Sequence, residues 1–189
     1  MPLSDIITLP NDNLRKKSSR ISLHEDLDEL IRRMKDATLD WEDSREHEVG
    51  VALAAIQINE LKRLVIIRNN FDNKEDKTFQ IFINPEITKY EGDLVEDFEG
   101  CLSITDIYGK VPRYSRVRVK ALNVHGQQIR IKAEGFLARV FQHEIDHTNG
   151  IVFIDHIKDI PDAFYKLEVD GKLNPIDYKD VRSSKILWN

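Results

Sequence analysis

The stretch GFLARVFQHEIDHTNG, residues Gly135–Gly150, is the most informative part of the sequence for both the fold and the ligand that the chain binds. Apolar residues recur in it at helical spacing and Gly150 is suited to end a helix, so the pattern predicts a helix. His143 and His147 are four residues apart, which places both imidazoles on one face where they can reach a single ion. Glu144 points about 100° away, near enough to contact a water on that ion. The stretch therefore predicts a metal-binding helix that supplies two ligands.

Short apolar runs upstream of this helix predict β-strands. VGVALAAIQI, RLVIIR and FQIFINPEITKYEG are separated by polar turns. SRVRVKALNVHGQQIRIKA alternates around His125-Gly126, as the two arms of a hairpin do. We therefore expect an α+β fold in which antiparallel strands pack around the central metal-binding helix.

Two further helices are expected. S-L-H-E after Ile21 offers a capping box of Ser22 with Glu25, and the following apolar residues, up to Trp41, predict an N-terminal amphipathic helix of about five turns. IVFIDHI is typical of a short extended segment. Pro161 is well placed to begin a helix through Leu167.

Length and composition limit the remaining possibilities. The 189 residues, 41% of them hydrophobic, suit one domain over residues 1–189, with the tail from about residue 171 unassigned. A net charge of -5 provides no overall basic field, so we expect no specific nucleic acid binding. The basic runs Arg15–Arg20 and Arg113–Lys120 are typical of solvated faces. Neither a signal sequence nor a membrane span is recognisable, which favours a cytoplasmic protein.

A catalytic metal takes three protein ligands, and the residues alone leave three candidates for the third. His156 follows the two histidines, but it comes three residues later than in metzincins, where Phe153 stands at the ligand position. Glu168 would give a thermolysin-like set of two histidines and a glutamate. Cys101, the only cysteine, lies upstream in EGCLS.

Three short motifs, in this order, make the chain resemble the peptide deformylase family. They are Gly50–Gln57 (GVALAAIQ), Glu99–Ser103 (EGCLS) and Gln142–His147 (QHEIDH), with Ala52 in place of the family's second glycine. The similarity extends from ITLPNDNLRKKS near the start to about Ile157. The resemblance implies that Cys101 is the third ligand. It also implies a hydrolase that removes the formyl group from the N-terminal formyl-methionine of nascent peptides and releases formate.

The implied ligands and catalytic residues agree with the chemistry. One thiolate and two neutral imidazoles leave an open position for a water, whose pKa falls towards ~7. Glu144 would take a proton from that water and deliver it to the departing amine. The resemblance implies that the side-chain amide of Gln57 and the backbone N–H of Leu102 stabilise the oxyanion. It also implies Fe²⁺ as the ion, although Zn²⁺, Ni²⁺ or Co²⁺ would accept the same ligands.

The expected substrate is an N-formyl-methionyl peptide lying extended along Val51, Ala52 and Gly100. Phe136 and Val140 either line a pocket for the methionine side chain or belong to the core. The methyl group of Ala52 would narrow the groove if the family's glycine permits close approach of the backbone.

Second-sphere contacts and other functions complete the expectations. The resemblance suggests a Glu99–Arg113 ion pair, and Asp146 would orient a ligand or the helix. Two other functions stay open: a zincin-like endopeptidase that uses His156 or Glu168, and a non-catalytic metal-binding or ribosome-associated module. A deformylase would itself be expected to contact the ribosome only transiently.

Overall fold

A computed structural model describes residues 5–22 and 24–188 and has mixed helix and antiparallel-sheet architecture. Neighbouring strands pair along one seven-stranded sheet in the order β1 (Ala52–Ala54), β2 (Leu64–Arg68), β3 (Phe79–Cys101), β4 (Ile104–Leu122), β6 (Phe164–Leu167) and β7 (Leu173–Pro175), with β5 (Gln128–Glu134) also paired to β4. The helices are α1 (Asp28–Asp43), α2 (Gly135–Thr148), α3 (Tyr178–Ser183) and α4 (Lys185–Trp188), with 3₁₀ turns η1 (Asp12–Arg15), η2 (Ala55–Ile58) and η3 (Phe153–His156). Within these described ranges, no helix is long and apolar enough to cross a membrane.

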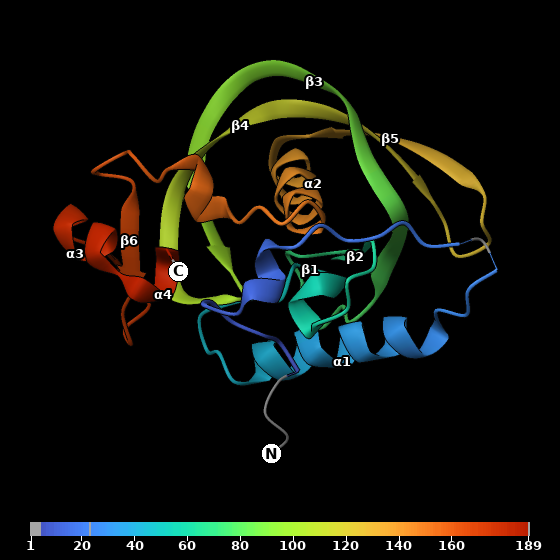
Figure 1. Cartoon of the computed structure of the whole chain (residues 1–189), viewed down its shortest axis with the longest axis horizontal. Helices are drawn as coiled ribbons and strands as arrows, with labels where there is room; N and C mark the ends of the chain where they lie inside the picture. Colours follow the sequence, from blue (N-terminus) through green and yellow to red (C-terminus); the bar gives the residue numbers. More distant parts are fainter. Residues whose placement is uncertain (1–4, 23, 189) are drawn as a thin grey trace.

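Helix α2 lies beneath the arch formed by β3 and β4 (Figure 1). Its residues Val140, Phe141 and Ile145 are buried in one cluster with Val117 and Val119 of β4. Alternation along β4 turns these valines inward, so the strand covers the helix with one face and leaves the other in solvent. The packing fixes the orientation of α2, which carries the histidine pair.

The end of α2 is set by Gly150. Its φ of 77° is a backbone conformation that L side chains rarely adopt, and an added Cβ would lie 2.5 Å from the carbonyl oxygen of Arg15. The chain therefore turns sharply behind His147 and packs against the N-terminal segment. Gly150 ends the helical region as expected.

Helix α1 begins later than predicted. Leu27 is its N-cap and makes no side-chain capping bond, so the expected capping box of Ser22 is wrong. The cause is tertiary: the side chain of Asn84 in β3 accepts a hydrogen bond from Ile21 N and donates one to Ile21 O. These bonds fasten the backbone at Ile21 to the sheet just before the expected cap.

Two predictions for the region after α2 are also wrong. Residues Phe153–His156 form η3 instead of an extended segment, because Asp155 accepts a hydrogen bond from Val152 N and closes a turn. The expected helix from Pro161 to Leu167 is replaced by β6, which pairs with Ile107–Gly109 of β4.

The tail beyond residue 171 also has structure. It adds β7, α3 and α4, and Leu187 is buried in the same cluster as Phe164 and Cys101.

Candidate functional site

Cys101, His143 and His147 come together where β3 ends above α2. Their ligand atoms all lie within 4.8 Å of one another, and all three residues are buried. The Sγ atom of Cys101 is 3.2 Å from Nε2 of His147. In residues 5–22 and 24–188 this is the one group of three or more such side chains close enough to hold an ion. One thiolate and two imidazoles in this arrangement fit a divalent metal with an open coordination position.

The other ligand candidates take different positions. His156 lies with Nε2 2.7 Å from Asp146 Oδ2 and 3.1 Å from Arg113 Nη1, outside the Cys-His-His group. Glu168 follows β6, and its carboxylate is within ion-pair distance of Lys166. Neither side chain joins the two histidines of α2.

Glu99 connects His143 to two arginines. Its carboxylate is 3.0 Å from Nδ1 of His143, and it accepts hydrogen bonds from Nε of Arg113 at 2.9 Å and from Nη1 of Arg139 at 2.7 Å. Burial alone would raise the pKa of Glu99, but its contacts with His143 and Arg113 hold that pKa well below its usual value. This contact at Nδ1 fixes the orientation of the His143 ring and leaves Nε2 as the ring nitrogen that can bind a metal.

Glu144 lies in a different environment, although it is also buried. Its Oε2 atom has no hydrogen-bond partner among the described residues. Burial raises the pKa of Glu144 to about 7, and the neighbouring charge of His143 opposes the shift. A buried carboxyl group with an unsatisfied oxygen and a pKa near neutrality suits a group that accepts and returns a proton.

The two histidines are affected in opposite directions. Burial would lower the pKa of His143, but its contacts with Cys101 and Glu99 raise it well above the usual value. Burial lowers the pKa of His147 well below the usual value, helped by the charge of His143. Nδ1 of His147 has no hydrogen-bond partner within the described ranges.

Gln57 and Leu102 occupy the wall near Cys101. Oε1 of Gln57 accepts a hydrogen bond from Ala54 N at 2.9 Å, which leaves Nε2 to donate to Ser103 Oγ at 3.1 Å and to Cys101 Sγ at 3.6 Å. Leu102 follows Cys101 directly, in the short turn between β3 and β4. Both residues line the same cavity.

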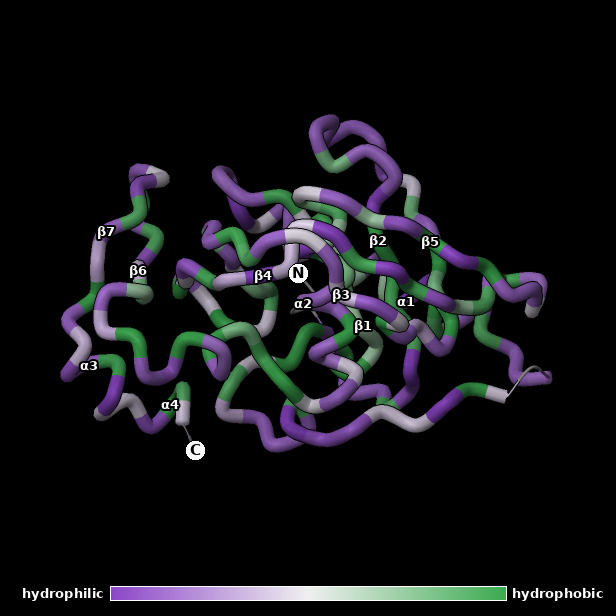
Figure 2. The backbone as a smooth tube through the Cα atoms, turned by 90° about the horizontal axis from the view of Figure 1, so that it is seen from above, coloured by the Kyte–Doolittle hydropathy of each residue, from purple (hydrophilic) through white to green (hydrophobic). Residues whose placement is uncertain are grey.

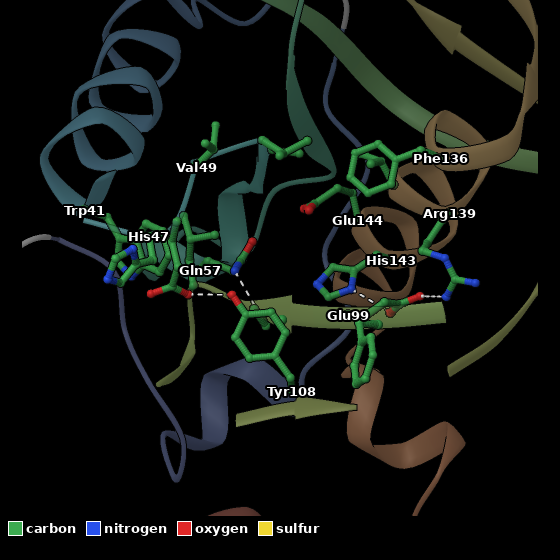
Figure 3. Close-up of a pocket in the computed structure, with 18 residues that line it drawn as sticks. Trp41, His47, Val49, Gln57, Glu99, Tyr108, Phe136, Arg139, His143 and Glu144 are labelled. Atoms are coloured by element: carbon green, nitrogen blue, oxygen red, sulfur yellow. Dashed lines mark hydrogen bonds and ion pairs between the residues drawn. The ribbon is translucent and has the colours of Figure 1, made fainter. Parts of the chain in front are cut away.

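That cavity has a volume of about 290 Å³, and every residue predicted to bind substrate lines it. Figure 3 shows His143 and Glu144 on α2, across the cavity from Gln57. The predicted residues in its lining are Val51, Ala52, Gly100, Phe136 and Val140. Ala52 lies in β1 and is absent from the residues with positive φ, so this strand does not need a glycine conformation there.

Several lining residues were missed by sequence reasoning: Trp41, His47, Glu48, Val49, Phe98, Tyr108 and Arg139. The Tyr108 hydroxyl donates to Glu48 at 2.8 Å, and an added Cβ at Gly100 would lie 2.7 Å from the Tyr108 ring. A sequence pattern could have indicated Arg139, because it lies one helical turn before His143 and therefore on the same face of the helix. No sequence pattern indicates Tyr108, since its position depends on the folded hairpin.

Known proteins share this sequence and fold. The profile of the polypeptide deformylase family matches residues 3–162. The peptide deformylase of Brachyspira hyodysenteriae is 37% identical over 189 residues, 99% of this chain and 96% of its own length. A Synechococcus elongatus peptide deformylase in complex with actinonin has a TM-score of 0.72 at 33% identity, with 85% of this chain and 83% of that chain covered.

A class I type b peptide deformylase from Acinetobacter baumannii, with Met-Ala-Ser bound, has a TM-score of 0.70 at 31% identity, with 80% and 96% covered. Such similarity favours neither an endopeptidase nor a non-catalytic module. The chain belongs to the peptide deformylase family and is a hydrolase that removes the N-formyl group from the N-terminal formyl-methionine of nascent proteins.

Proposed function

We propose that the cavity beside Cys101, His143 and His147 is where deformylation takes place. The observation that carries this proposal is the gathering of three buried ligand atoms within 4.8 Å of one another. The unsatisfied Oε2 of Glu144 on the same helix supports it. Fe²⁺ is the ion we propose for the working enzyme, and Zn²⁺, Ni²⁺ or Co²⁺ would also accept these ligands.

The residues around the ligands divide the chemistry among them. A bound divalent ion would supply Lewis acidity to the attacking water and to the formyl carbonyl. Glu144 takes a proton from the water at its carboxylate and then gives it to the departing amine, so that formate and a free N-terminus result. The Gln57 amide and the Leu102 backbone N–H donate to the carbonyl oxygen as it becomes negative.

The peptide extends along Val51, Ala52 and Gly100, and Phe136 and Val140 receive the methionine side chain. Support for this comes from the common cavity that these five residues line. The related A. baumannii enzyme with Met-Ala-Ser bound supports a peptide of this kind. An extended peptide next to β1 would form strand-like backbone hydrogen bonds.

The wider setting is also part of the proposal. Residues 1–189 act as one catalytic domain in the cytoplasm, where formylated nascent chains are made, and any contact with the ribosome is transient. The structured tail from β7 to α4 packs on the cluster containing Cys101, which supports its inclusion in that domain.

Formate release from formyl-Met-Ala-Ser by anaerobically purified, Fe²⁺-loaded protein tests the proposal. Turnover should disappear in Glu144→Ala with metal retained, and Cys101→Ala should lose the metal. His156→Ala is the matched control, because it removes an imidazole outside the ligand group. Turnover that survives Cys101→Ala, or metal loss in His156→Ala alone, would contradict the proposed ligand set.

A further inference from the structure

Arg68, the last residue of β2, is a buried cation that the proposed chemistry does not use. Its side chain is fully buried, and Nη2 donates to Oε2 of Glu42 in α1 at 2.7 Å. The Glu42 side chain is only 2% exposed. Taking two charges out of water is costly, so a buried ion pair is weak evidence for a role in stability alone. The other contacts of this pair lead to two loops at the edge of the cavity.

The first of these loops, residues 44–49, joins α1 to the backbone that precedes β1. Oε2 of Glu42 also accepts a hydrogen bond from Gly50 N at 2.8 Å, and Nε of Arg68 donates to Gly50 O at 3.1 Å. The ion pair therefore holds both backbone polar groups of Gly50 and closes the base of the loop. Three residues of this loop line the cavity: His47, Glu48 and Val49.

The same guanidinium group holds the second loop, residues 69–78, which joins β2 to β3. Nη1 of Arg68 donates to Lys74 O at 3.1 Å, and Nζ of Lys74 donates to Arg45 O in the first loop at 3.4 Å. Loops at the periphery of the molecule are largely hydrophilic (Figure 2). The second loop is hydrophilic except at Phe71, its one hydrophobic residue. The position of this ring therefore indicates what the second loop contacts.

Phe71 packs against the apolar end of the cavity. Its ring is edge-on to that of Phe136, with the ring centroids 5.0 Å apart and an interplanar angle of 61°. This is a preferred geometry for a pair of aromatic rings. Phe136 lines the cavity and is 47% exposed, so Phe71 supports a ring that is half open to solvent. The second loop thus extends the wall that α2 supplies.

We propose that Phe71 is a further specificity-determining residue that closes the methionine end of the cavity with Phe136, and that Glu42 and Arg68 position both loops. The role of Phe71 rests on the proposed function, in which Phe136 receives the methionine side chain. Neither Glu42 nor Arg68 is among the described residues that line the cavity, so the pair acts on substrate binding and not on proton transfer. Loss of such binding raises KM and leaves kcat unchanged.

Kinetics with formyl-Met-Ala-Ser and formyl-Ala-Ala-Ser test the role of Phe71. Phe71→Ala should raise KM for the methionine substrate about tenfold, with kcat and metal content unchanged, because part of the apolar wall is lost. The alanine substrate carries no side chain long enough to use that wall, so its kcat/KM should stay within about twofold of the wild-type value. Phe71→Leu keeps an apolar side chain and should recover part of the selectivity.

Arg68→Lys tests the positioning role. It keeps a positive charge beside Glu42 but loses the fork of donors that reaches Gly50 O and Lys74 O. KM for the methionine substrate should rise about tenfold with kcat within about twofold of wild type, and the preference for methionine over alanine should fall. A merely structural role would instead reduce the active fraction, which lowers kcat for both substrates equally and leaves KM unchanged.

The matched control is Arg33→Lys, because Arg33 of α1 also forms an ion pair with a glutamate, Glu60, with Nη1 and Oε1 2.7 Å apart. It should keep the wild-type KM and selectivity. Titration calorimetry with the product peptide Met-Ala-Ser measures affinity without turnover, and Phe71→Ala and Arg68→Lys should each bind it about tenfold more weakly than wild type. A failure of the proposed function, seen as no formate release by the wild type, is therefore distinguishable from a failure of this proposal.

Three outcomes would overturn the proposal. The first is wild-type affinity of Phe71→Ala for Met-Ala-Ser. The second is an equal loss of kcat for both substrates in Arg68→Lys with KM unchanged. The third is an equal rise of KM in Arg33→Lys.

Discussion

Glu99 and Glu144 are two buried carboxyl groups beside the same pair of histidines, and their surroundings differ completely. Glu99 contacts Arg113, Arg139 and His143, which keep its pKa well below the usual value. Glu144 has an unsatisfied oxygen, and burial raises its pKa to about 7. The surroundings, and not the residue type, therefore set the charge of each group: Glu99 stays ionised and holds the His143 ring, whereas Glu144 has the properties of the carboxyl group that we propose exchanges a proton.

The largest effect should come from the proton-exchanging carboxylate. Glu144→Gln keeps the shape of the side chain but cannot accept the proton, so turnover should fall by 10² to 10⁴ while metal content stays at the wild-type level. Formate release and elemental analysis on the same sample measure the two quantities. Equal loss of metal and activity would assign Glu144 to positioning and would remove the distinction from Glu99.

The raised pKa of Glu144 should also be visible in the stability of metal-free protein. A folded-state pKa near 7, above the ordinary value of 4.5, means that the contribution of Glu144 to stability is greatest below about pH 4.5 and is lost as pH rises through 7. That fall amounts to roughly 3 kcal/mol, since each pKa unit corresponds to 1.36 kcal/mol. Urea unfolding of chelator-treated wild type and Glu144→Gln between pH 5 and 8 measures the difference. Parallel pH profiles of the two proteins would contradict the raised pKa.

The comparison also separates what the sequence predicted from what it did not. The spacing of the helix predicted the histidine pair, because residues four apart lie on one face, and it placed Glu144 beside His143. The EGCLS motif added Cys101 by resemblance. Phe136 and Val140, which line the cavity, followed from the same helix. Spacing along one element was therefore sufficient for one wall of the cavity.

The opposite wall depends on contacts between distant segments. The Tyr108 hydroxyl donates a hydrogen bond to Glu48, which is 60 residues away in the sequence, and no local pattern links these two residues. Likewise, β6 forms where β4 offers a pairing edge at Ile107–Gly109, although Pro161 locally favours a helix start. Tertiary pairing overrides local preference in both places.

Removing the charge of the positioning carboxylate should have a smaller effect than removing the proton carrier. Glu99→Gln leaves His143 without its charged partner, and such losses weaken metal affinity by about 10 to 100-fold. Competition with a chelator measures this affinity. Glu99→Gln also removes the carboxylate that pairs with Arg139 and leaves Arg113 with Asp146 alone. Glu99→Asp therefore serves as the variant that keeps the charge, and it should recover part of the affinity. A large fall in turnover of the fully metal-loaded Glu99→Gln enzyme would mean that the two carboxylates share one role.

The smallest effect should come from Arg139, which donates to the same Glu99 oxygen as Arg113 does. Its guanidinium also donates to the carbonyl oxygens of Val111 and Val95, each at 2.7 Å, and so ties α2 to both strands of the arch. Arg139→Lys keeps the positive charge but not the fork of donors, so it should cost about 1–3 kcal/mol of stability and change metal affinity only a few-fold, because Arg113 still holds Glu99. Urea unfolding and chelator competition separate these two quantities. If metal affinity fell as far as in Glu99→Gln, the position of Glu99 would depend on Arg139 more than on Arg113, and the carboxylate would have to be regarded as held mainly from the helix.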